Sequence, residues 1–295
     1  MDIGREVYAG VAAGPTGTSH SCEWNGESPN QKEVVITIME DHVADFYRTD
    51  EYIRQNPSLH EEDSPWKVTK IIPLVDRFID CNNKGHITVM DVGGGAGLIL
   101  SEISSYIEDK HKINVDKYAL DLSPGMLEIQ KQRNPQLKRA LNEDICCTTL
   151  RDKEIDLVLL IDLLEHVPNT AKALEEVKRI SSYAIFKVPL GGWLIYTLWN
   201  QISGGKPRRY VIEKYGHVNI YTYSELRGQI QEHTGQILCA CFTNFHEYYF
   251  SHTFTGIKGT LLNLMHIAGT LTFKFSPRLA AFMFGDFAML LVKCY

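Results

Sequence analysis

Apolar residues recur along this chain with two different periods, and together they predict alternating strands and helices. Apolar runs rich in β-branched residues indicate strands at residues 89–91, 117–122, 139–145, 154–162, 183–189, 236–242 and 287–293. Between them, apolar residues at helical spacing indicate helices, for example over residues 169–180. Because the run 154–162 is almost continuously apolar, we expect a parallel strand that is buried on both faces. The alternation predicts a doubly wound α/β domain.

The first of these strands opens into a turn with an unusual density of glycine. After Asp91, glycines occupy positions 93, 94, 95 and 97, and apolar residues at helical spacing follow at once. A strand that turns through glycines into a helix directs backbone N–H groups and the positive end of the helix dipole toward a ligand. A phosphate-binding Walker loop would need a lysine after Gly97, and a dinucleotide loop would need glycine at 98 or 100, where leucine stands. The turn therefore indicates a nucleotide-like ligand of another kind.

Acidic residues follow the predicted strands at one edge of the sheet. Asp91, Asp121, Asp144 and Asp162 each close a successive strand, and ligands of open α/β sheets bind beyond the carboxyl ends of the strands. Asp121 lies farther along than in dinucleotide-binding folds because a polar linker, residues 108–116, precedes its strand. An acid in this place accepts hydrogen bonds from ribose hydroxyls. For Asp144, the neighbouring Asn142 and Glu143 are alternatives.

The spacing Asp-x-Gly-x-Gly-x-Gly, at Asp91, Gly93, Gly95 and Gly97, resembles the first motif of the class I S-adenosylmethionine-dependent methyltransferases. The resemblance covers about residues 64–190, with weaker similarity to the end. It implies a seven-stranded, mostly parallel sheet with an antiparallel last strand, and S-adenosyl-L-methionine as cofactor. It also implies that the glycine turn contacts the methionine portion of the cofactor and that the segment around Asp162 lines the methyl-donor end. The remaining cofactor residues that it implies are Asp121 at the ribose, Asp144 at the adenine amino group, Met126 and Ile145 against the adenine ring, and Leu122 beside Asp121 in the sequence.

Histidines near the expected donor end are candidates for the chemistry. The stretch Leu-Leu-Glu-His-Val-Pro at 163–168 resembles the corresponding segment of ubiquinone-type and natural-product O-methyltransferases. We take His166 as the first candidate for a general base and His217 as the second, with His246 third. Asp162, Glu165 and His166 could instead hold a divalent cation. Because acids at a helix start are explained by the helix dipole, we predict no metal site.

The net charge and the cysteine content bear on whether the protein binds nucleic acid or zinc. The net charge of −6 disfavours a nucleic-acid substrate. The seven cysteines lack the Cys-x-x-Cys pairs of zinc sites, so we expect buried free thiols. With no secretory signal in view, we expect a cytoplasmic protein.

The domain plan has three parts. Residues 1–30 are polar and aperiodic and predict a mobile tail, residues 31–84 predict a helical cap, and residues 85–295 predict the methyltransferase domain. In the cap, Ser64 should begin a helix that Pro73 bends, unless the helix begins later. Two insertions, 191–222 and 246–285, interrupt the domain. The second holds 15 uncharged residues, 259–273, which is too short to cross a bilayer; a lid is favoured over a homodimer surface or an interfacial membrane contact.

The sequence as a whole predicts an S-adenosylmethionine-dependent methyltransferase with a small-molecule acceptor, most simply a hydroxyl or amine of a partly apolar metabolite. An NAD-dependent oxidoreductase would share the fold, but its glycine fingerprint is absent. Two alternatives stay open: a catalytically inactive binding or scaffold protein with the same loop, and a protein or peptide methyltransferase.

Overall fold

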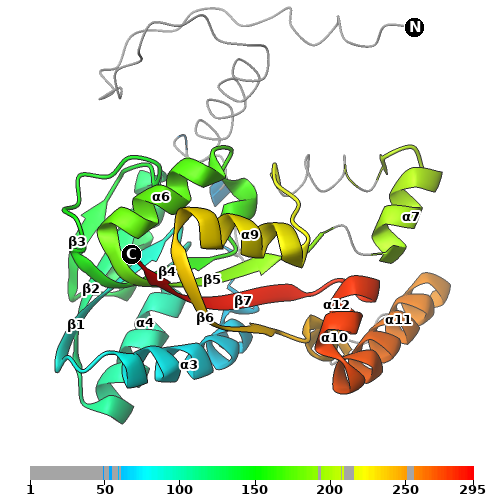
Figure 1. Ribbon diagram of the computed structural model, residues 1–295, viewed down its shortest axis with the longest axis horizontal. Helices are drawn as coiled ribbons and strands as arrows, with labels where there is room; N and C mark the ends of the chain where they lie inside the picture. Colours follow the sequence, from blue (N-terminus) through cyan, green and yellow to red (C-terminus); the bar gives the residue numbers. More distant parts are fainter. Residues whose placement is uncertain are drawn as a thin grey trace, which may run out of the picture.

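A single seven-stranded sheet runs through the domain, with helices on both of its faces (Figure 1). This computed structural model describes residues 49, 53–54, 59, 61–191, 194–206, 208, 216–250 and 256–295. The strands are β1 (His86–Val92), β2 (Asn114–Leu120), β3 (Leu137–Leu141), β4 (Ile155–Ile161), β5 (Ser181–Pro189), β6 (Gly235–Phe242) and β7 (Phe287–Cys294). Their order is β3-β2-β1-β4-β5-β7-β6, and β7 pairs antiparallel with both neighbours. The predicted mostly parallel sheet with an antiparallel last strand is confirmed.

The helices cover the two faces of the sheet separately. One face is covered by α3 (Ser64–Cys81) and α4 (Leu98–Tyr106), and the other by α6 (Thr170–Ile180) and α9 (Tyr223–His233) (Figure 1). The ends of these helices follow from local chemistry. The Asn169 side chain accepts the N–H of Lys172 at the start of α6, and Thr222 and Glu225 form a capping box at the start of α9.

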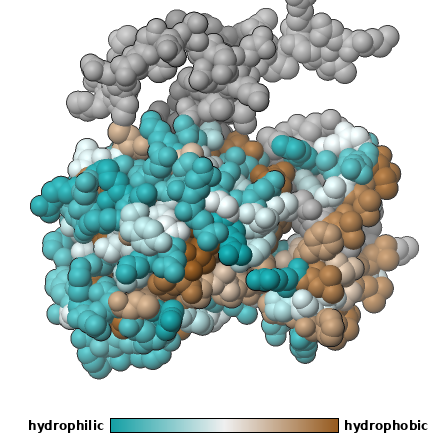
Figure 2. Space-filling view, viewed as in Figure 1, coloured by the Kyte–Doolittle hydropathy of each residue, from teal (hydrophilic) through white to brown (hydrophobic). Residues whose placement is uncertain are grey.

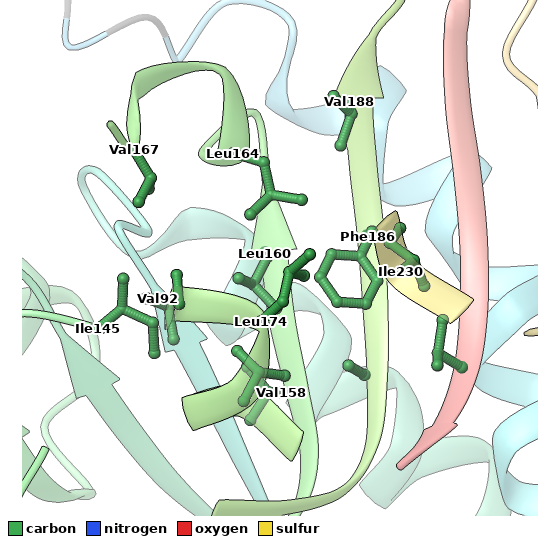
Figure 3. Close-up of a cluster of buried hydrophobic side chains, with 14 of the residues drawn as sticks. Val92, Ile145, Val158, Leu160, Leu164, Val167, Leu174, Phe186, Val188 and Ile230 are labelled. Atoms are coloured by element: carbon green, nitrogen blue, oxygen red, sulfur yellow. The ribbon is translucent and has the colours of Figure 1, made fainter. Parts of the chain in front are cut away.

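Alternation along β4 divides the hydrophobic core into two halves. Leu157 and Leu159 point to the side of α3 and α4, whereas Val158 and Leu160 point to the side of α6 and α9. Figure 3 shows the second half, where Leu160 and Leu174 from α6 pack together. All seven residues of β4 are buried, which confirms the prediction of a strand covered on both faces.

The remaining helices lie near the edges and in the insertions. They are α5 (Pro124–Arg133), α7 (Leu194–Ile202), α10 (Phe245–Phe250), α11 (Gly256–Phe275) and α12 (Pro277–Phe284), with a π-helix η1 at Ile107–His111 and a 3-10 turn η2 at Leu164–His166. The insertion helices α10, α11 and α12 pack on one another between β6 and β7 (Figure 1). Among the described residues, none of the helices is long and apolar enough to cross a membrane.

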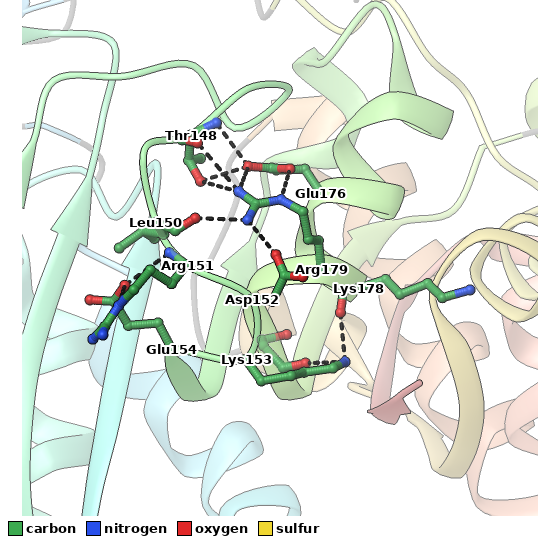
Figure 4. Close-up of polar contacts among 10 residues, drawn as sticks. Thr148, Leu150, Arg151, Asp152, Lys153, Glu154, Glu176, Lys178 and Arg179 are labelled. Carbon is green, nitrogen blue, oxygen red and sulfur yellow. Dashed lines mark hydrogen bonds and ion pairs between the residues drawn. The ribbon is translucent and has the colours of Figure 1, made fainter.

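A network around Arg179 fixes the end of α6 to the loop before β4 (Figure 4). Its guanidinium donates to Glu176 Oε1 (2.7 Å), Asp152 Oδ1 (2.8 Å) and the carbonyl of Leu150 (2.7 Å). Thr148 joins the same network through Glu176. A planar guanidinium can serve several acceptors at once, so one residue holds both segments in place.

Three boundaries differ from the prediction. The strand expected at 139–145 ends at Leu141, because Asp144 closes a turn with its own carboxylate. The expected polar linker 108–116 is mostly structured, as η1 reaches His111 and β2 begins at Asn114. Helix α3 begins at Ser64 and continues through Pro73, so a later start is wrong.

Cysteine burial also differs from expectation. Cys81, Cys147 and Cys241 are exposed, and of the six cysteines in the described part only Cys294 is buried. Within the described part of the chain, none of the six forms a disulfide. The predicted tail and the helices expected before residue 49 lie outside the described residues, as does Cys22.

Candidate cofactor and active site

The sheet reverses its order between β1 and β4, and this defines where a ligand can bind. From β1 the chain runs outward to β2 and β3, and from β4 it runs the other way. Helices after these two strands pack on opposite faces of the sheet, so a ligand crevice is expected at the carboxyl ends of β1 and β4. The glycine turn after β1 and the loop after β4 both lie at this edge.

The glycine turn is packed on one side and open on the other. Gly93 donates its N–H to the carbonyl of Leu120 (2.8 Å) and has a φ of +61°. A Cβ at Gly93 would lie 2.7 Å from Leu163 Cδ1, so glycine is required where the turn passes the loop after β4. Gly95 also has a positive φ (+53°), but apart from its chain neighbours no described atom lies within 4 Å of where its Cβ would stand. The space over Gly95 is free to receive a ligand.

The turn leads directly into a helix N-terminus. Gly97, with a φ of +76°, is the N-cap residue of α4, and its carbonyl accepts the Asn134 side-chain amide (3.0 Å). The first N–H groups of any helix have no partner within the helix, and they carry its positive partial charge. The open side of the turn therefore favours an anionic or strongly polar ligand group.

Asp91 lies beneath the turn as a buried carboxylate without a partner. Its side chain belongs to β1, the residue is 1% exposed, and neither carboxylate oxygen has a hydrogen-bond partner within the described part of the chain. A Cβ on Gly94 would overlap this carboxylate, so the carboxylate reaches the floor of the turn. Burial, reinforced by the negative charge of Asp121, raises the pKa of Asp91 to about 7. Because a buried carboxylate without a partner is costly, a cation or donor from a ligand would stabilise it.

Asp121 stands at the end of β2 in a tightly held loop. Its backbone N–H donates to Leu141, and its Oδ1 accepts the N–H of Ser123 (2.9 Å). The Asn142 side-chain amide donates to the carbonyls of Asp121 (3.0 Å) and Leu122 (2.8 Å). These contacts fix the carboxylate at the edge where a ribose was predicted. Asn142, which sequence analysis treated as an alternative to Asp144, serves here to hold the loop.

Met126 and Ile145 are both buried near this edge. Met126 lies in the first turn of α5, which Ser123 caps by accepting the Met126 N–H (3.0 Å). Ile145 belongs to the core beside Val92 (Figure 3). Asp144, predicted to accept from the adenine, uses its Oδ1 to hold the N–H of Cys146 (2.8 Å). Asp144 thus lies beyond the end of β3, in a turn that its own side chain stabilises.

Asp162 is held between two lysines. It follows β4 with a φ of +54°, an uncommon conformation for a residue with a side chain. Its carboxylate accepts from Lys187 on β5, which is fully buried, and from Lys67 on α3 (3.0 Å). Burial opposes ionisation of Asp162, but the ammonium groups of Lys187 and Lys67 outweigh it and lower its pKa to about 2. The ion triad joins α3, β4 and β5 at the predicted methyl-donor end.

The two predicted catalytic histidines, His166 and His217, lie in contact although they are far apart in the chain. The contact includes Gly216, the residue before His217, which is 50 residues from His166. His166 ends η2, and its ring packs edge-on against that of His217 with centroids 4.9 Å apart. His166 Nδ1 lies 3.2 Å from the carbonyl of Gly216, so in a neutral ring Nδ1 donates and the lone pair is on Nε2. Burial lowers the pKa of His217, although Asp162 opposes this, which favours a neutral imidazole.

Asn219 fixes the segment 216–221, which carries His217, against the turn η2, which carries His166. Its side-chain amide donates to the carbonyls of Leu164 (3.0 Å) and Val167 (2.6 Å), and its N–H donates to the carbonyl of Glu165 (3.0 Å). This role of Asn219 was not predicted from the sequence.

Glu165 completes a group with metal-ligand geometry. A carboxylate oxygen of Glu165 and one ring nitrogen each of His166 and His217 lie within 4.8 Å of one another. Glu165 is buried, and its Oε2 has no hydrogen-bond partner among the described residues. Burial and the charge of Asp162 raise the pKa of Glu165 to about 8. The sequence analysis named Asp162, Glu165 and His166 as possible cation ligands. In the structure the third ligand of such a set would be His217, because the carboxylate of Asp162 is paired with Lys67 and Lys187.

Lys67 and Lys187 were missed by the sequence analysis. Lys187 could have been found from the sequence, since it is the one charged residue in the apolar run 183–189. A lysine that is buried in a sheet needs a carboxylate partner, and Asp162 is in reach. Lys67 could not have been found in this way, because it stands among other polar residues of a predicted helix.

His246 lies outside the site. It is fully buried between α10 and α11, with Nδ1 3.1 Å from His266 Nδ1 and Nε2 3.2 Å from the carbonyl of Gly285. Burial and the neighbouring His266 lower the pKa of His246 to about 4. These contacts give His246 a structural role, so the third candidate base stands apart from the other two.

The strand order, the antiparallel β7 and the acid-and-glycine loop define a class I methyltransferase fold. Comparison with known proteins agrees. A protein-family profile described as a methyltransferase domain matches residues 90–182, from β1 to the beginning of β5. The chain therefore contains a methyltransferase domain over residues 90–182, set in a sheet with the class I methyltransferase strand order.

Two curated relatives each match a little under half of the chain. A ubiquinone biosynthesis O-methyltransferase of Paraburkholderia phymatum is 26% identical over 136 residues, which are 44% of this chain and 52% of that protein. An uncharacterized methyltransferase of Mycobacteroides abscessus is 27% identical over 139 residues, with the same coverage of 44% and 52%. The chain thus spans about half the length of the curated relatives it matches.

Solved structures share the fold at low sequence identity. Geranyl diphosphate methyltransferase in complex with SAM has a TM-score of 0.52 and 10% identity, covering 77% of this chain and 85% of that one. The cyclopropane synthase MmaA2 of Mycobacterium tuberculosis has a TM-score of 0.50 and 11% identity, covering 75% and 83%. At such identities the likeness concerns the fold alone.

Proposed function

We propose that this protein binds S-adenosylmethionine at the β1–β4 crevice and transfers its methyl group to a small-molecule acceptor. The observation that carries the proposal is Asp91, a buried carboxylate without a described partner under an open glycine turn. An amino-acid ligand with a free ammonium group would stabilise it, and the methionine portion of S-adenosylmethionine carries one. The match of residues 90–182 to a methyltransferase domain supports the same cofactor.

The residues present fit the parts of this cofactor. Gly93, Gly95 and Gly97 would surround the methionine portion, and Asp121 would accept from the ribose hydroxyls. Leu122, Met126 and Ile145 would hold the adenine ring, with Asp144 at its amino group. Asp162, neutralised by its lysines, would shape the donor end without offering an unpaired negative charge.

The bound cofactor supplies an already activated methyl group, so this chain must align the acceptor and remove its proton. His166 is the proposed base, because the contact from Nδ1 to the Gly216 carbonyl leaves the lone pair on Nε2. His217 holds the ring of His166 edge-on and would share the proton. Glu165, whose raised pKa keeps it protonated near neutral pH, would add no repulsive charge beside an ionising hydroxyl.

A small, partly apolar acceptor is the proposed substrate. The chain carries a net charge of −6, which does not favour nucleic acid. One relative is named for ubiquinone biosynthesis and one solved relative in the fold is named for geranyl diphosphate, and both names point to compounds with apolar chains. An inactive scaffold protein and a protein methyltransferase are the competing functions.

Titration calorimetry with three ligands tests the cofactor proposal. We expect S-adenosylmethionine and S-adenosylhomocysteine to bind the full chain at submillimolar concentration and NAD not to bind. Gly95→Val, which fills the open space over the turn, should abolish binding while the far-ultraviolet circular dichroism is unchanged. Failure of both sulfur ligands to bind the wild type would refute the proposal, and NAD binding would favour an oxidoreductase.

A further inference from the structure

Helix α11 turns its apolar side chains outward. Leu261, Leu264, Ile267, Leu271 and Phe275 recur at helical spacing along one face, and Leu261 and Phe275 are 63% and 87% exposed. The opposite face packs inward: His266 is buried, and a Cβ on Gly269 would collide with the ring of His246. An ordinary surface helix would show the reverse orientation.

Two neighbouring helices extend this apolar face. On α12, Leu279 and Phe282 are exposed, and on α7, which contacts α12, Leu198, Trp199 and Ile202 are exposed. Figure 2 shows hydrophobic residues gathered over the side of the molecule where α11 and α12 lie. We call the outward sides of α7, α11 and α12 the apolar face. Contiguous exposed apolar surface of this kind marks a binding surface for a protein or a membrane.

The charges on these helices are all positive. By sequence, the charged residues of α7, α11 and α12 are Lys258, Lys274 and Arg278, and no acid occurs in the three helices. Lys274 and Arg278 are exposed at the junction of α11 and α12. Lys206 and Arg208, which follow α7, are exposed as well. This contrasts with the net charge of −6 of the whole chain.

We propose that the apolar face docks on the surface of an anionic lipid bilayer. Exposed Leu, Phe and Trp side chains bordered by Lys and Arg are the pattern of helices that lie in the membrane interface, and anionic headgroups complement the cations. A second copy of the chain fits less well. A twofold interface would bring the same face of each copy together, and α7, α11 and α12 carry cations but no carboxylate with which to pair them.

The apolar face borders the candidate active site. Strand β7 follows α12 directly, and its first residue, Phe287, pairs with Pro189 at the carboxyl end of β5. The Phe287 ring lies over Lys187 Nζ, 3.5 Å from its centroid, and Lys187 holds Asp162. Helix α10 packs on α11, and its Tyr248 ring lies tilted against that of Trp66 on α3, with ring centroids 5.0 Å apart. Docking would therefore place the site beside the bilayer, where an apolar acceptor resides; this last step rests on the proposed function.

Vesicle co-sedimentation of the full chain tests the docking without any methyl donor. We expect binding to phosphatidylcholine vesicles that contain phosphatidylglycerol, weaker binding to pure phosphatidylcholine, and weakening by salt. Leu271→Asp/Phe275→Asp should reduce partitioning about tenfold or more, because each change removes an exposed apolar contact. Lys274→Glu/Arg278→Glu should reduce it about tenfold or more on anionic vesicles only.

Matched controls lie elsewhere on the surface. Tyr295→Asp changes an exposed aromatic residue beyond the end of β7, at the opposite edge of the sheet, and Lys131→Glu/Lys172→Glu reverses two exposed cations on α5 and α6. Both controls should bind vesicles like the wild type. S-adenosylhomocysteine affinity, measured on the same variants, should be unchanged, which separates this test from that of the proposed function.

Two results would overturn the docking proposal. One is that the wild type fails to sediment with anionic vesicles. The other is that analytical ultracentrifugation finds a dimer that Phe275→Asp dissociates while vesicle binding is absent or unaffected by the same change. The second result would assign the apolar face to another copy of the chain.

Discussion

The pH dependence of cofactor binding should report the ionisation of Asp91. Its pKa is raised to about 7 by burial, reinforced by Asp121, and both carboxylate oxygens lack a described partner. A ligand ammonium group would favour the ionised carboxylate and lower this pKa in the complex. Binding should therefore release a proton below pH 7, and affinity should rise with pH until Asp91 is ionised in the free protein.

The size of the effect follows from the titration. With a pKa of about 7, about one molecule in eleven carries ionised Asp91 at pH 6 and about ten in eleven at pH 8. If only the ionised form binds, the dissociation constant of S-adenosylhomocysteine should fall about tenfold between these pH values. This ligand suits the assay because its α-ammonium remains largely protonated over the range.

Calorimetry in buffers of different ionisation enthalpy measures both the affinity and the proton release. Asp91→Asn keeps the shape of the side chain and removes its titration, so its affinity should be lower than that of the wild type and nearly independent of pH. An equal affinity of the wild type at pH 6 and pH 8, with no proton released, would refute the assignment of Asp91 to the ligand.

Three further substitutions test separate parts of the structure. His166→Ala should leave S-adenosylhomocysteine affinity within about twofold and slow methyl transfer by about 10²-fold to 10⁴-fold, measured as product release with a hydroxyl acceptor of the wild type; undiminished turnover would assign the proton to another group. Lys187→Met should lower the free energy of unfolding by about 2–4 kcal/mol in urea, because the partly buried Asp162 keeps one cation fewer, whereas a loss under about 1 kcal/mol would mean that Lys67 alone neutralises Asp162. Arg179→Met should cost about 2–3 kcal/mol in the same assay without changing cofactor affinity, since its acceptors in Figure 4 lose their donor; a large affinity change with unchanged stability would contradict a purely structural role.

Sequence periodicity predicted the sheet well because burial on both faces leaves little choice of residue. The run 154–162 could only be a central strand, and β4 is buried along its whole length. Turn chemistry was harder to predict. Asp144 looked like the tip of a strand, yet its side chain closes a turn that ends β3 early.

The candidate site was predictable where one segment carries it and harder where distant segments meet. The glycine turn with Asp91 is local, so its spacing alone identified it. The pairing of His166 with His217 depends on Asn219, which binds the carbonyls around η2, and that contact has no pattern in the sequence. The neutralisation of Asp162 by Lys67 similarly joins segments far apart in the chain.

The central claim is that a nucleoside cofactor binds at the carboxyl edge of β1 and β2 through Asp121. Two substitutions at opposite ends of β2 test it most directly. Asp121→Ala, just after the strand, removes the predicted ribose acceptor. Asp116→Ala, near the start of the strand, is the control and removes an acid that pairs with His86 and Lys138. Titration with S-adenosylhomocysteine should show an affinity about 10-fold to 100-fold weaker for Asp121→Ala, the loss expected for hydrogen bonds to a charged group, and unchanged affinity for Asp116→Ala. Equal affinities for both variants and the wild type would contradict the account.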